Sequence, residues 1–354
     1  MDAQVGRRSD QRLKELLEKF VCVRAVEMEG VDLSLFQFDY DNTWTAFFLN
    51  ADHTIYGRYG TRSSGGGDVG DDVSIAGFVK ALEGALEVHA GYPANKPSLA
   101  SKRGAAPEAN EIRDFPIFRS RFAEPPPRGC AHCHHVFEAL RSVPRRDKKP
   151  IPEDLMWPYP KPDRLGLSLA LDERATVATV AAASAAERAG FAPHDRITTM
   201  EGQPIISIAD VQWVLQHAKV PGDVTTEVER AGAKQKLTLH LAADWRKGED
   251  ITWRPSTAPM RPFRWQDADP AQRTALGVKD GALCARVRNV GNGSAGQKAG
   301  LAVGDAIVEI DGSATSMDEN QWLSYVQQKN VRGDIIVLTV IHGGKRVKLR
   351  LQAP

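Results

Sequence analysis

The residues whose types and spacing point to a definite chemistry lie in the segment CAHCHH at positions 130–135. Two cysteines three positions apart, followed at once by a histidine, form the C-x-x-C-H pattern at which a c-type haem is attached. On the first turn of a helix, the thiols of Cys130 and Cys133 would face the same way and could form thioethers with the two haem vinyl groups. His134 would then point its imidazole at the iron as the proximal ligand. The pattern therefore predicts one covalently bound haem c.

Three other interpretations fit the same residues. A C-x-x-C pair at a helix N-terminus is also the redox-active dithiol of thiol-disulfide enzymes, because the helix dipole lowers the pKa of the thiol. Two cysteines and three histidines could also hold zinc or copper, although zinc sites usually take a second ligand pair at a distance. A structural disulfide or an accidental spacing is the third. We favour haem because a redox dithiol has no need of His134.

The sixth position of the haem iron needs a soft or imidazole donor from elsewhere in the chain. Met156 is the first choice, because it lies in the proline-rich stretch LMWP after the helix that follows the motif. His89 is the second choice, because it ends a predicted helix, where the helix dipole alone also favours a histidine. An open five-coordinate iron is the third. His135 is the poorest candidate, because a neighbouring residue points about 100° away around a helix.

Composition excludes several classes of partner. A chain of 354 residues is long enough for two or three domains. Its 46 basic and 45 acidic residues leave a net charge of +1, which argues against binding nucleic acid or a membrane surface through charge. No apolar run approaches the roughly 18 residues of a transmembrane helix. Cys22 and Cys284 each lie in an apolar run and are expected to be buried thiols.

The first eight residues carry charges but no apolar segment, so no signal peptide is visible. Covalent haem attachment takes place outside the cytoplasm. We therefore expect a periplasmic or secreted protein whose sequence is truncated at the N-terminus.

The N-terminal third shows a sequence of alternating elements. The patterns predict an amphipathic helix capped by Ser9, then a strand, a hairpin and a second helix, at residues 9–20, 21–26, 43–49 with 54–59, and 74–89. Residues 91–129 are expected to be an irregular connection. A helix, a strand, a hairpin and a helix in this order match a thioredoxin fold that has lost its beginning.

The segment FFLNADHTIYGRYG at residues 47–60 resembles the central hairpin of thioredoxin-like domains. The first strand and the active-site C-x-x-C of such domains are missing here. The residues Asn42-Thr43-Trp44 also stand where these domains place a cis-proline. The resemblance therefore implies a fold kept as a docking platform rather than a thiol-disulfide enzyme.

The second half of the chain contains an internal repeat. The segments SAAERAGF at residues 184–191 and SAGQKAGL at residues 294–301 lie 110 residues apart, and Asp195 and Asp305 match at the same offset. A duplication at this length predicts two small domains rather than a solenoid.

Both copies resemble PDZ domains, specifically the circularly permuted kind attached to bacterial periplasmic proteases. The resemblance implies a groove between a strand and a helix, where an extended peptide adds as an extra strand. It also implies that each Leu-Gly-apolar triplet receives a terminal carboxylate. The implied binding residues are Leu165, Gly166, Leu167 and Ser168 in the first copy, and Leu276, Gly277 and Val278 in the second. One or both grooves could instead be blind, the second more readily than the first.

The order of parts resembles that of secreted bacterial proteins joining a thioredoxin-like domain, a C-x-x-C-H segment and two PDZ domains. We predict an α/β plus mainly-β multidomain chain with a truncated thioredoxin-like domain, a short helical haem-binding connector and two PDZ-like domains. The expected division is 1–122, 123–163, 164–245, a linker at 246–270, and 271–354.

We expect a non-enzymatic haem protein for electron transfer or redox sensing, docked to a protein or peptide partner through its PDZ grooves. The alternatives are a thiol-disulfide oxidoreductase using Cys130 and Cys133, or a peptide-binding scaffold without redox activity. A protease is disfavoured, because the glycine-flanked Ser294 lies in the repeated segment and no preceding β-barrel supplies His and Asp partners.

Overall fold

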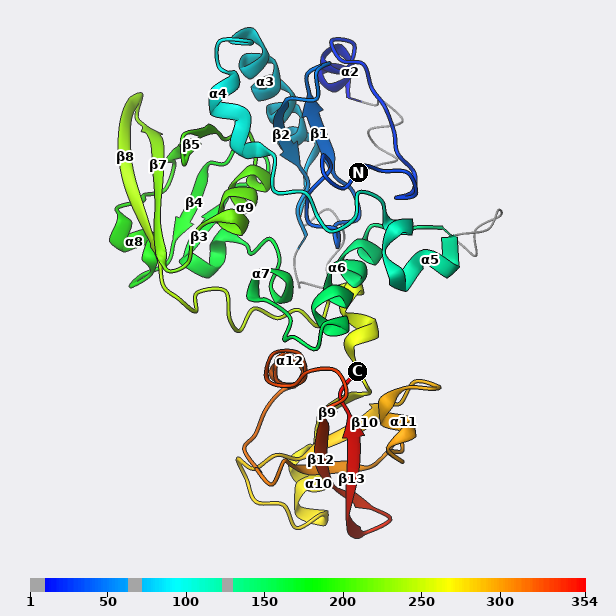
Figure 1. Ribbon diagram of the computed structural model, residues 1–354. Coiled ribbons are helices and arrows are strands. Elements are labelled where there is room, and N and C mark those ends of the chain that lie inside the picture. The colour runs from blue at the N-terminus through cyan, green and yellow to red at the C-terminus, as the bar shows by residue number, and fades with distance from the viewer. Residues whose placement is uncertain (1–9, 63–71, 123–129) are drawn as a thin grey trace. The chain divides into compact units, whose positions relative to one another are not determined.

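The computed structural model describes residues 10–62, 72–122 and 130–354 (Figure 1). The chain forms two compact units. The first comprises residues 1–139 and 157–249, and the second comprises residues 140–156 and 250–354. This differs from the expected division, because the N-terminal region and the first repeat copy belong to one unit.

The N-terminal helices and hairpin form where the patterns predict them. Helix α2 (Gln11–Leu17) begins at Asp10, whose side chain accepts a hydrogen bond from the Leu13 N–H at 2.7 Å. The expected cap Ser9 lies outside the described residues. The strands β1 (Ala46–Leu49) and β2 (Ile55–Tyr59) pair antiparallel, and helix α3 (Ile75–Ala90) is capped by Ser74.

The strand predicted at residues 21–26 is wrong. The described residues there have no regular structure, and Val21, Val23 and Val26 are 95%, 90% and 80% exposed. Cys22 is exposed as well, which corrects the expectation of a buried thiol, whereas Cys284 is buried as expected. A β-branched run becomes a strand only where a sheet receives it. The sheet here has two strands, β1 and β2, so the described residues do not show the central sheet expected of a thioredoxin-like domain.

Residues 91–122 are more ordered than expected. They contain the short helices α4 (Lys96–Leu99), η2 (Ala100–Lys102), η3 (Ile112–Asp114) and α5 (Pro116–Phe122). Ile112 and Phe115 are completely buried, so this connection adds to the core.

The core of the first unit joins the N-terminal region to the first repeat copy. Leu13 and Leu16 of α2 pack with Phe78 and Leu82 of α3 and with Ile206, which precedes helix α9 (Ile208–His217). Burying several large apolar side chains together is the main favourable contribution to folding. The two regions therefore fold as one body.

The first repeat copy contains two small sheets. Strands β3 (Leu167–Leu169) and β4 (Val177–Val180) form one sheet. The second sheet has the order β6-β5-β7-β8. Its strands are β5 (Arg196–Met200), β6 (Gln203–Pro204), β7 (Gly222–Arg230) and β8 (Ala233–Leu241), and the helices are η4 (Pro162–Leu165), α8 (Ala185–Ala189) and α9.

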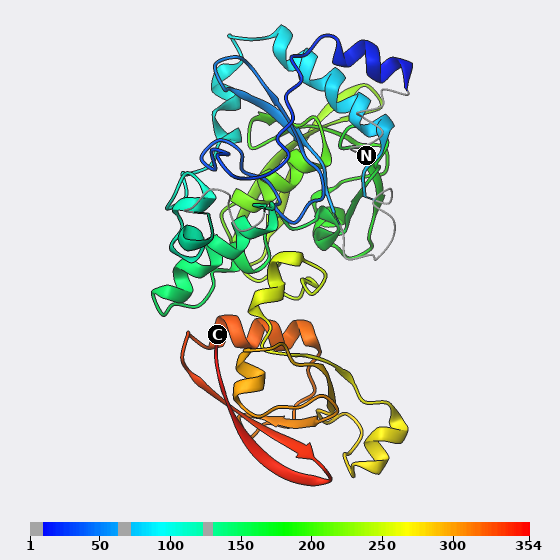
Figure 2. The ribbon, with the colours of Figure 1, turned by 90° about the vertical axis from the view of Figure 1, so that its right-hand side faces the viewer.

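The second repeat copy has one five-stranded sheet in the order β13-β12-β11-β10-β9 (Figure 2). The strands are β9 (Arg264–Asp267), β10 (Ala285–Asn289), β11 (Ala306–Ile310), β12 (Ile335–His342) and β13 (Lys345–Gln352). Its helices are η5 (Pro255–Met260), α10 (Pro270–Ala275), α11 (Ala295–Lys298), α12 (Glu319–Ser324) and the π-helical turn η6 (Tyr325–Lys329), and the second unit also contains α7 (Glu153–Met156). The separate sheets of the two copies confirm the predicted duplication.

The repeated Ser-Ala-x-x-x-Ala-Gly segment is a capped helical turn in both copies. The side chains of Ser184 and Ser294 accept hydrogen bonds from the backbone N–H three residues later, at 3.1 and 3.2 Å. Gly190 and Gly300 follow with φ values of 88° and 87°, the left-handed conformation that favours glycine. The repeat therefore has a structural role, and Ser294 serves as a helix cap.

Candidate functional site

The C-x-x-C-H segment is arranged differently from the expected helical turn. Helix α6 (His134–Arg146) begins at His134, and residues 130–132 before it have no regular structure. Cys130 is exposed, Cys133 is half-buried, and both are free thiols. The premise that two thiols share the first turn of a helix is therefore wrong. The covalent haem itself stays a prediction, but these residues do not show the arrangement from which we derived it.

The electrostatics of Cys133 disfavour an activated thiol. Burial raises the pKa of the Cys133 thiol, and the negative charge of Asp41 raises it further. A nucleophilic or redox-active cysteine needs a lowered pKa, because the thiolate is the reactive form. Cys133 is therefore a protonated thiol at neutral pH, which weakens the thiol-disulfide alternative.

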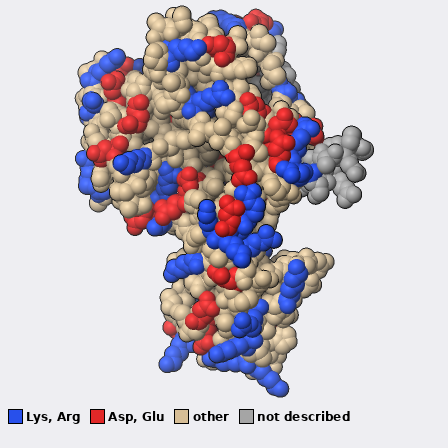
Figure 3. Space-filling model, viewed as in Figure 1, with Lys and Arg blue, Asp and Glu red and all other residues tan. Residues whose placement is uncertain are grey.

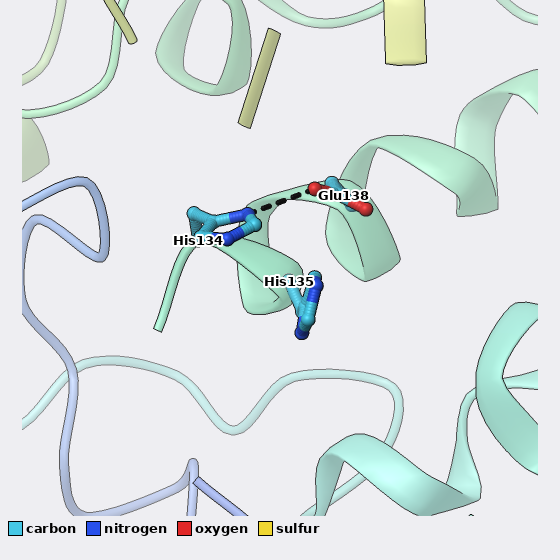
Figure 4. A group of neighbouring side chains, drawn as sticks. All are labelled: His134, His135 and Glu138. Atoms are coloured by element: carbon cyan, nitrogen blue, oxygen red, sulfur yellow. Dashed lines mark hydrogen bonds and ion pairs between the residues drawn. The ribbon is translucent and has the colours of Figure 1, made fainter. Parts of the chain in front are cut away.

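Three histidines gather around the start of α6. The ring centroids of His134 and His135 are 4.3 Å apart, and the His132 ring lies 5.7 Å from the first and 5.4 Å from the second. The Nδ1 atom of His134 lies 2.9 Å from Glu138 Oε1 (Figure 4). The Nδ1 atom of His135 accepts a hydrogen bond from the His132 N–H at 3.0 Å.

The two residues expected to supply the sixth haem ligand lie in surroundings that differ from the expected ones. His89 is one residue before the end of α3, and its Nδ1 lies 2.8 Å from the Tyr56 hydroxyl. Met156 ends α7 and is completely buried in the second unit, not in a loop as expected. Their predicted roles as iron ligands stay predictions.

The predicted carboxylate loop of the first copy lies at the start of β3. Leu165 and Leu167 are buried, at 4% and 1% exposure, whereas Gly166 and Ser168 are half-buried. Gly166 has a φ of 82°, and its N–H already donates to the Asp163 carbonyl at 2.9 Å. One of the N–H groups expected to receive a terminal carboxylate is thus engaged within the chain.

The helix of the first copy is covered by the N-terminal region. The Arg58 N–H of β2 donates to Asp210 Oδ1 at 3.2 Å, and the Ser207 hydroxyl donates to the Arg58 carbonyl. The Arg58 guanidinium stacks on the Trp213 ring at 3.7 Å, and the Trp213 N–H donates to the Ser101 carbonyl at 2.9 Å. Every side chain from residue 209 to 215 is buried.

Two cations are buried beside Asp210. The Lys102 ammonium lies 3.0 Å from Asp210 Oδ1, and both side chains have no exposed surface. Burial lowers the pKa of Lys102 and lowers that of Arg58 to about 10, while the negative charge of Asp210 opposes both shifts. A buried ion pair of this kind needs both partners in place. It fixes α9 to the N-terminal region.

The N-terminal region also contacts the segment that follows β3 in the first copy. The Ser74 hydroxyl donates to the Leu171 carbonyl at 2.9 Å, just after β3. A small pocket lined by Tyr59, Leu171 and Ile208 lies here and has room for about one water molecule. The described residues thus leave little space for a peptide here.

The predicted carboxylate loop of the second copy ends a helix. Leu276, Gly277 and Val278 follow α10, and their N–H groups donate to the carbonyls of residues 272, 274 and 273 at 3.0 to 3.1 Å. These three N–H groups are used within the helix end and are not arranged to receive a carboxylate. The first triplet also follows a short helix, because Leu165 ends η4 and the Gly166 N–H donates to a carbonyl three residues earlier, as the Gly277 N–H does.

The strand of the second copy that lies beside helix α12 is β9, which sequence reasoning missed. It forms one edge of the five-stranded sheet, and its Arg264 Nε lies 3.4 Å from Glu319 Oε1 of α12. The rings of Phe263 and Trp265 each lie 5.5 Å from the Trp322 ring. The alternation of apolar and polar residues in PFRWQD was the signal that could have identified β9 as the strand.

Figure 3 shows the charged side chains on one face of the molecule. Acidic and basic side chains are interspersed on the face shown in Figure 3. Among the described residues, no helix has the length and apolar character needed to cross a membrane.

Comparisons with known proteins identify both repeat copies. A PDZ domain profile matches residues 163–241, and a second PDZ domain profile matches residues 286–340. No curated protein matches the chain.

Similar solved structures include the HtrA-type protease AlgWS227A with a decapeptide, at 23% identity, and the HtrA-type protease AlgW with a decapeptide, at 18% identity. The matches cover 25% and 36% of this chain, and 26% and 40% of those chains, both with a TM-score of 0.23. The chain thus spans well under half of either structure, and the likeness concerns the fold.

These findings correct the main function that we predicted. The parts of the chain that the comparisons identify are two PDZ domains, and neither of them is a haem-binding domain. The interpretation as a c-type haem protein for electron transfer or redox sensing is therefore wrong, and the alternative of a peptide-binding scaffold is better supported. Residues 163–241 and 286–340 are two PDZ domains.

Proposed function

We propose that this protein is a peptide-binding scaffold whose second PDZ domain receives an extended peptide along β9. The observation that carries the proposal is the position of β9 at the edge of its sheet. An edge strand presents a row of backbone N–H and C=O groups that can pair with an added strand. PDZ domains bind peptides in this way, and pockets for alternate side chains give specificity.

The surroundings of β9 fit such a groove. Helix α12 packs against β9, and the buried rings of Phe263 and Trp265 lie next to Trp322 of that helix. The rim carries Arg264, 57% exposed, and Glu319, 18% exposed. A peptide added along β9 would lie beside an aromatic core and two charged side chains, which suits a peptide with one apolar anchor and polar neighbours.

The first PDZ domain has a different role in this proposal. Its helix α9 is buried against β2 and η2, and Ser74 binds the carbonyl of Leu171 beyond β3. We infer that the first domain holds the N-terminal region in place and that the second domain binds the partner. This reverses the expectation that the second groove is the more readily blind one.

The test is a peptide selection followed by hydrogen exchange on the full chain. Peptides displayed with free C-termini are selected on the purified protein, and their affinities are measured by fluorescence anisotropy. Hydrogen exchange is then measured with and without the best peptide. We expect slower exchange of amides in residues 264–267, because the peptide would pair with that strand. Slower exchange in residues 167–169 instead, or no selected peptide, would overturn the proposal.

A charge reversal on the groove rim provides the matched variant. Arg264→Glu places a second acidic side chain at the rim beside Glu319 and is expected to weaken binding of the selected peptides about tenfold, a loss of roughly 1.4 kcal/mol. Arg288→Glu is the control, because Arg288 is an exposed arginine on the neighbouring strand β10. Equal losses in both variants would mean that general charge, rather than the groove, governs binding.

A further inference from the structure

The peptide-binding function does not explain the histidine cluster at the start of α6. His134, His135 and Glu138 each offer one ligand atom, and these atoms all lie within 4.8 Å of one another. Figure 4 shows the three side chains at the N-terminal end of the helix. His135 is 5% exposed, so one imidazole is held in the protein while the other two side chains remain partly accessible.

The spacing H-H-x-x-E explains why the three side chains meet. Residues three and four positions apart lie on the same face of a helix. Glu138 is four positions after His134 and three after His135, so it faces both imidazoles although these are neighbours in the sequence. The expectation that His135 points away from the others overlooked this shared partner.

We propose that His134, His135 and Glu138 bind a divalent transition-metal ion of the zinc type. Two imidazole nitrogens and a carboxylate oxygen are a ligand set that Zn²⁺ takes in proteins, with water in the fourth position. The set offers one carboxylate, whereas Ca²⁺ takes about 6–8 oxygen ligands and Mg²⁺ an octahedron of them. The cluster is therefore selective for a borderline metal by the type of its donors.

Metal binding requires two small rearrangements of existing contacts. Glu138 Oε1 must exchange its contact with His134 Nδ1 for the metal. His135 Nδ1 accepts the His132 N–H, so it must leave that hydrogen bond before it can ligate the metal through the same atom. The His132 N–H belongs to segment 130–132, which has no regular structure and contacts the chain through the Ala131 carbonyl, which accepts the Met28 N–H.

The neighbouring thiols are outside the proposed ligand set. Neither Cys130 nor Cys133 belongs to the group of described side chains whose ligand atoms lie within 4.8 Å of one another. The exposed Cys130 lies four residues before the helix begins. A Co²⁺ ion bound by nitrogen and oxygen ligands would therefore lack the cobalt–thiolate absorption band that a cysteine site would show.

The experiment titrates the full-length reduced protein with Zn²⁺ against a chromophoric chelator and with Co²⁺ as a spectroscopic probe. We expect one equivalent of Zn²⁺ and visible Co²⁺ bands without the intense near-ultraviolet band of a cobalt–thiolate bond. His134→Ala and His135→Ala should each weaken Zn²⁺ binding by about tenfold or more. Glu138→Gln should weaken it as well while keeping a hydrogen-bond partner for His134, and circular dichroism checks that each variant folds.

Two controls make the result decisive. His240 and Asp223 form another histidine–carboxylate contact, at 2.7 Å, with side chains 74% and 62% exposed, so His240→Ala should leave the affinity unchanged. The double variant Cys130→Ser and Cys133→Ser should also bind Zn²⁺ as the natural chain does. A loss of binding in the cysteine variant, a cobalt–thiolate band, or equal affinity in the natural chain and the histidine variants would overturn the proposal. So would a covalent haem spectrum of protein made with haem-maturation enzymes, since iron would then occupy His134.

Discussion

The ammonium of Lys102 lies 3.0 Å from the carboxylate of Asp210, and neither side chain has any exposed surface. Lys102 ends η2 in the N-terminal region, and Asp210 lies in the first turn of α9 in the first PDZ domain. Asp210 also accepts the backbone N–H groups of Arg58 and Ile206. One carboxylate thus ties together two regions that the sequence places about 100 residues apart.

We predict that Asp210→Asn destabilises the protein by about 3–5 kcal/mol, because it leaves the Lys102 charge buried without its partner. Urea unfolding at neutral pH measures the change. Glu229→Gln removes one partner of the exposed pair Arg196–Glu229 and should cost no more than about 1 kcal/mol. The double variant Lys102→Met with Asp210→Asn should be less destabilised than Asp210→Asn alone. A double variant that loses as much free energy of unfolding, or more, would show that the unpaired charge is not the cause.

We predict that Cys133 is alkylated several-fold more slowly than Cys130 in the folded protein. Cys133 is half-buried and the pKa of its thiol is raised, so less thiolate is present at a given pH. Mass spectrometry after timed treatment with iodoacetamide measures both rates, and the exposed Cys22 is a fast-reacting reference within the same chain. Equal alkylation rates at Cys133 and Cys130 would contradict this prediction and support the thiol-disulfide alternative.

We predict a pH-dependent contribution to stability from Asp195. Burial raises its pKa, but hydrogen bonds from Arg230 and from the Ala192 N–H outweigh burial, and the net pKa is lowered. A carboxyl whose folded-state pKa is depressed stabilises the fold above its unfolded pKa, and this stability is lost as the pH falls through the folded pKa. Arg230→Gln should therefore cost about 1.5–3 kcal/mol at pH 7 and progressively less below about pH 4.

The pH dependence separates this effect from a general loss of contacts. Arg188→Gln is the matched control, because Arg188 donates to the Ala183 carbonyl, an acceptor that does not titrate. Its cost in urea unfolding should be the same at pH 7 and pH 3. A cost of Arg230→Gln that stays constant over the same range would contradict the role of Asp195.

We predict that Val21→Thr and Val23→Thr change the free energy of unfolding by no more than about 0.5 kcal/mol each, because both side chains are almost fully exposed. Leu16→Ala in α2 should cost about 2–5 kcal/mol, because Leu16 is 1% exposed in the core. Urea unfolding measures all three. A large effect at Val21 or Val23 would mean that this segment is a core strand after all.

The sequence alone determined the elements and motifs whose causes are local. The capped helices 11–17 and 75–90 and the hairpin at 46–59 form because apolar periodicity, Asp or Ser caps and turn residues act over a few neighbours. The 110-residue repeat likewise predicted the two PDZ domains, because the same capped turn at Ser184 and Ser294 ends in the same glycine. These features need no distant part of the chain.

The tertiary structure decided which of the predicted strands form and which of the predicted site residues lie close together. The run at residues 21–26 has the propensity of a strand but no sheet to join, and the triplet at Leu276 has the sequence of a carboxylate loop but ends a helix. The start of α6 at His134 separated the cysteines from the helix and brought Glu138 to both histidines. Long-range packing chose among these alternatives, because burial of α9 against β2 and the position of β9 at the sheet edge depend on residues far apart in the sequence.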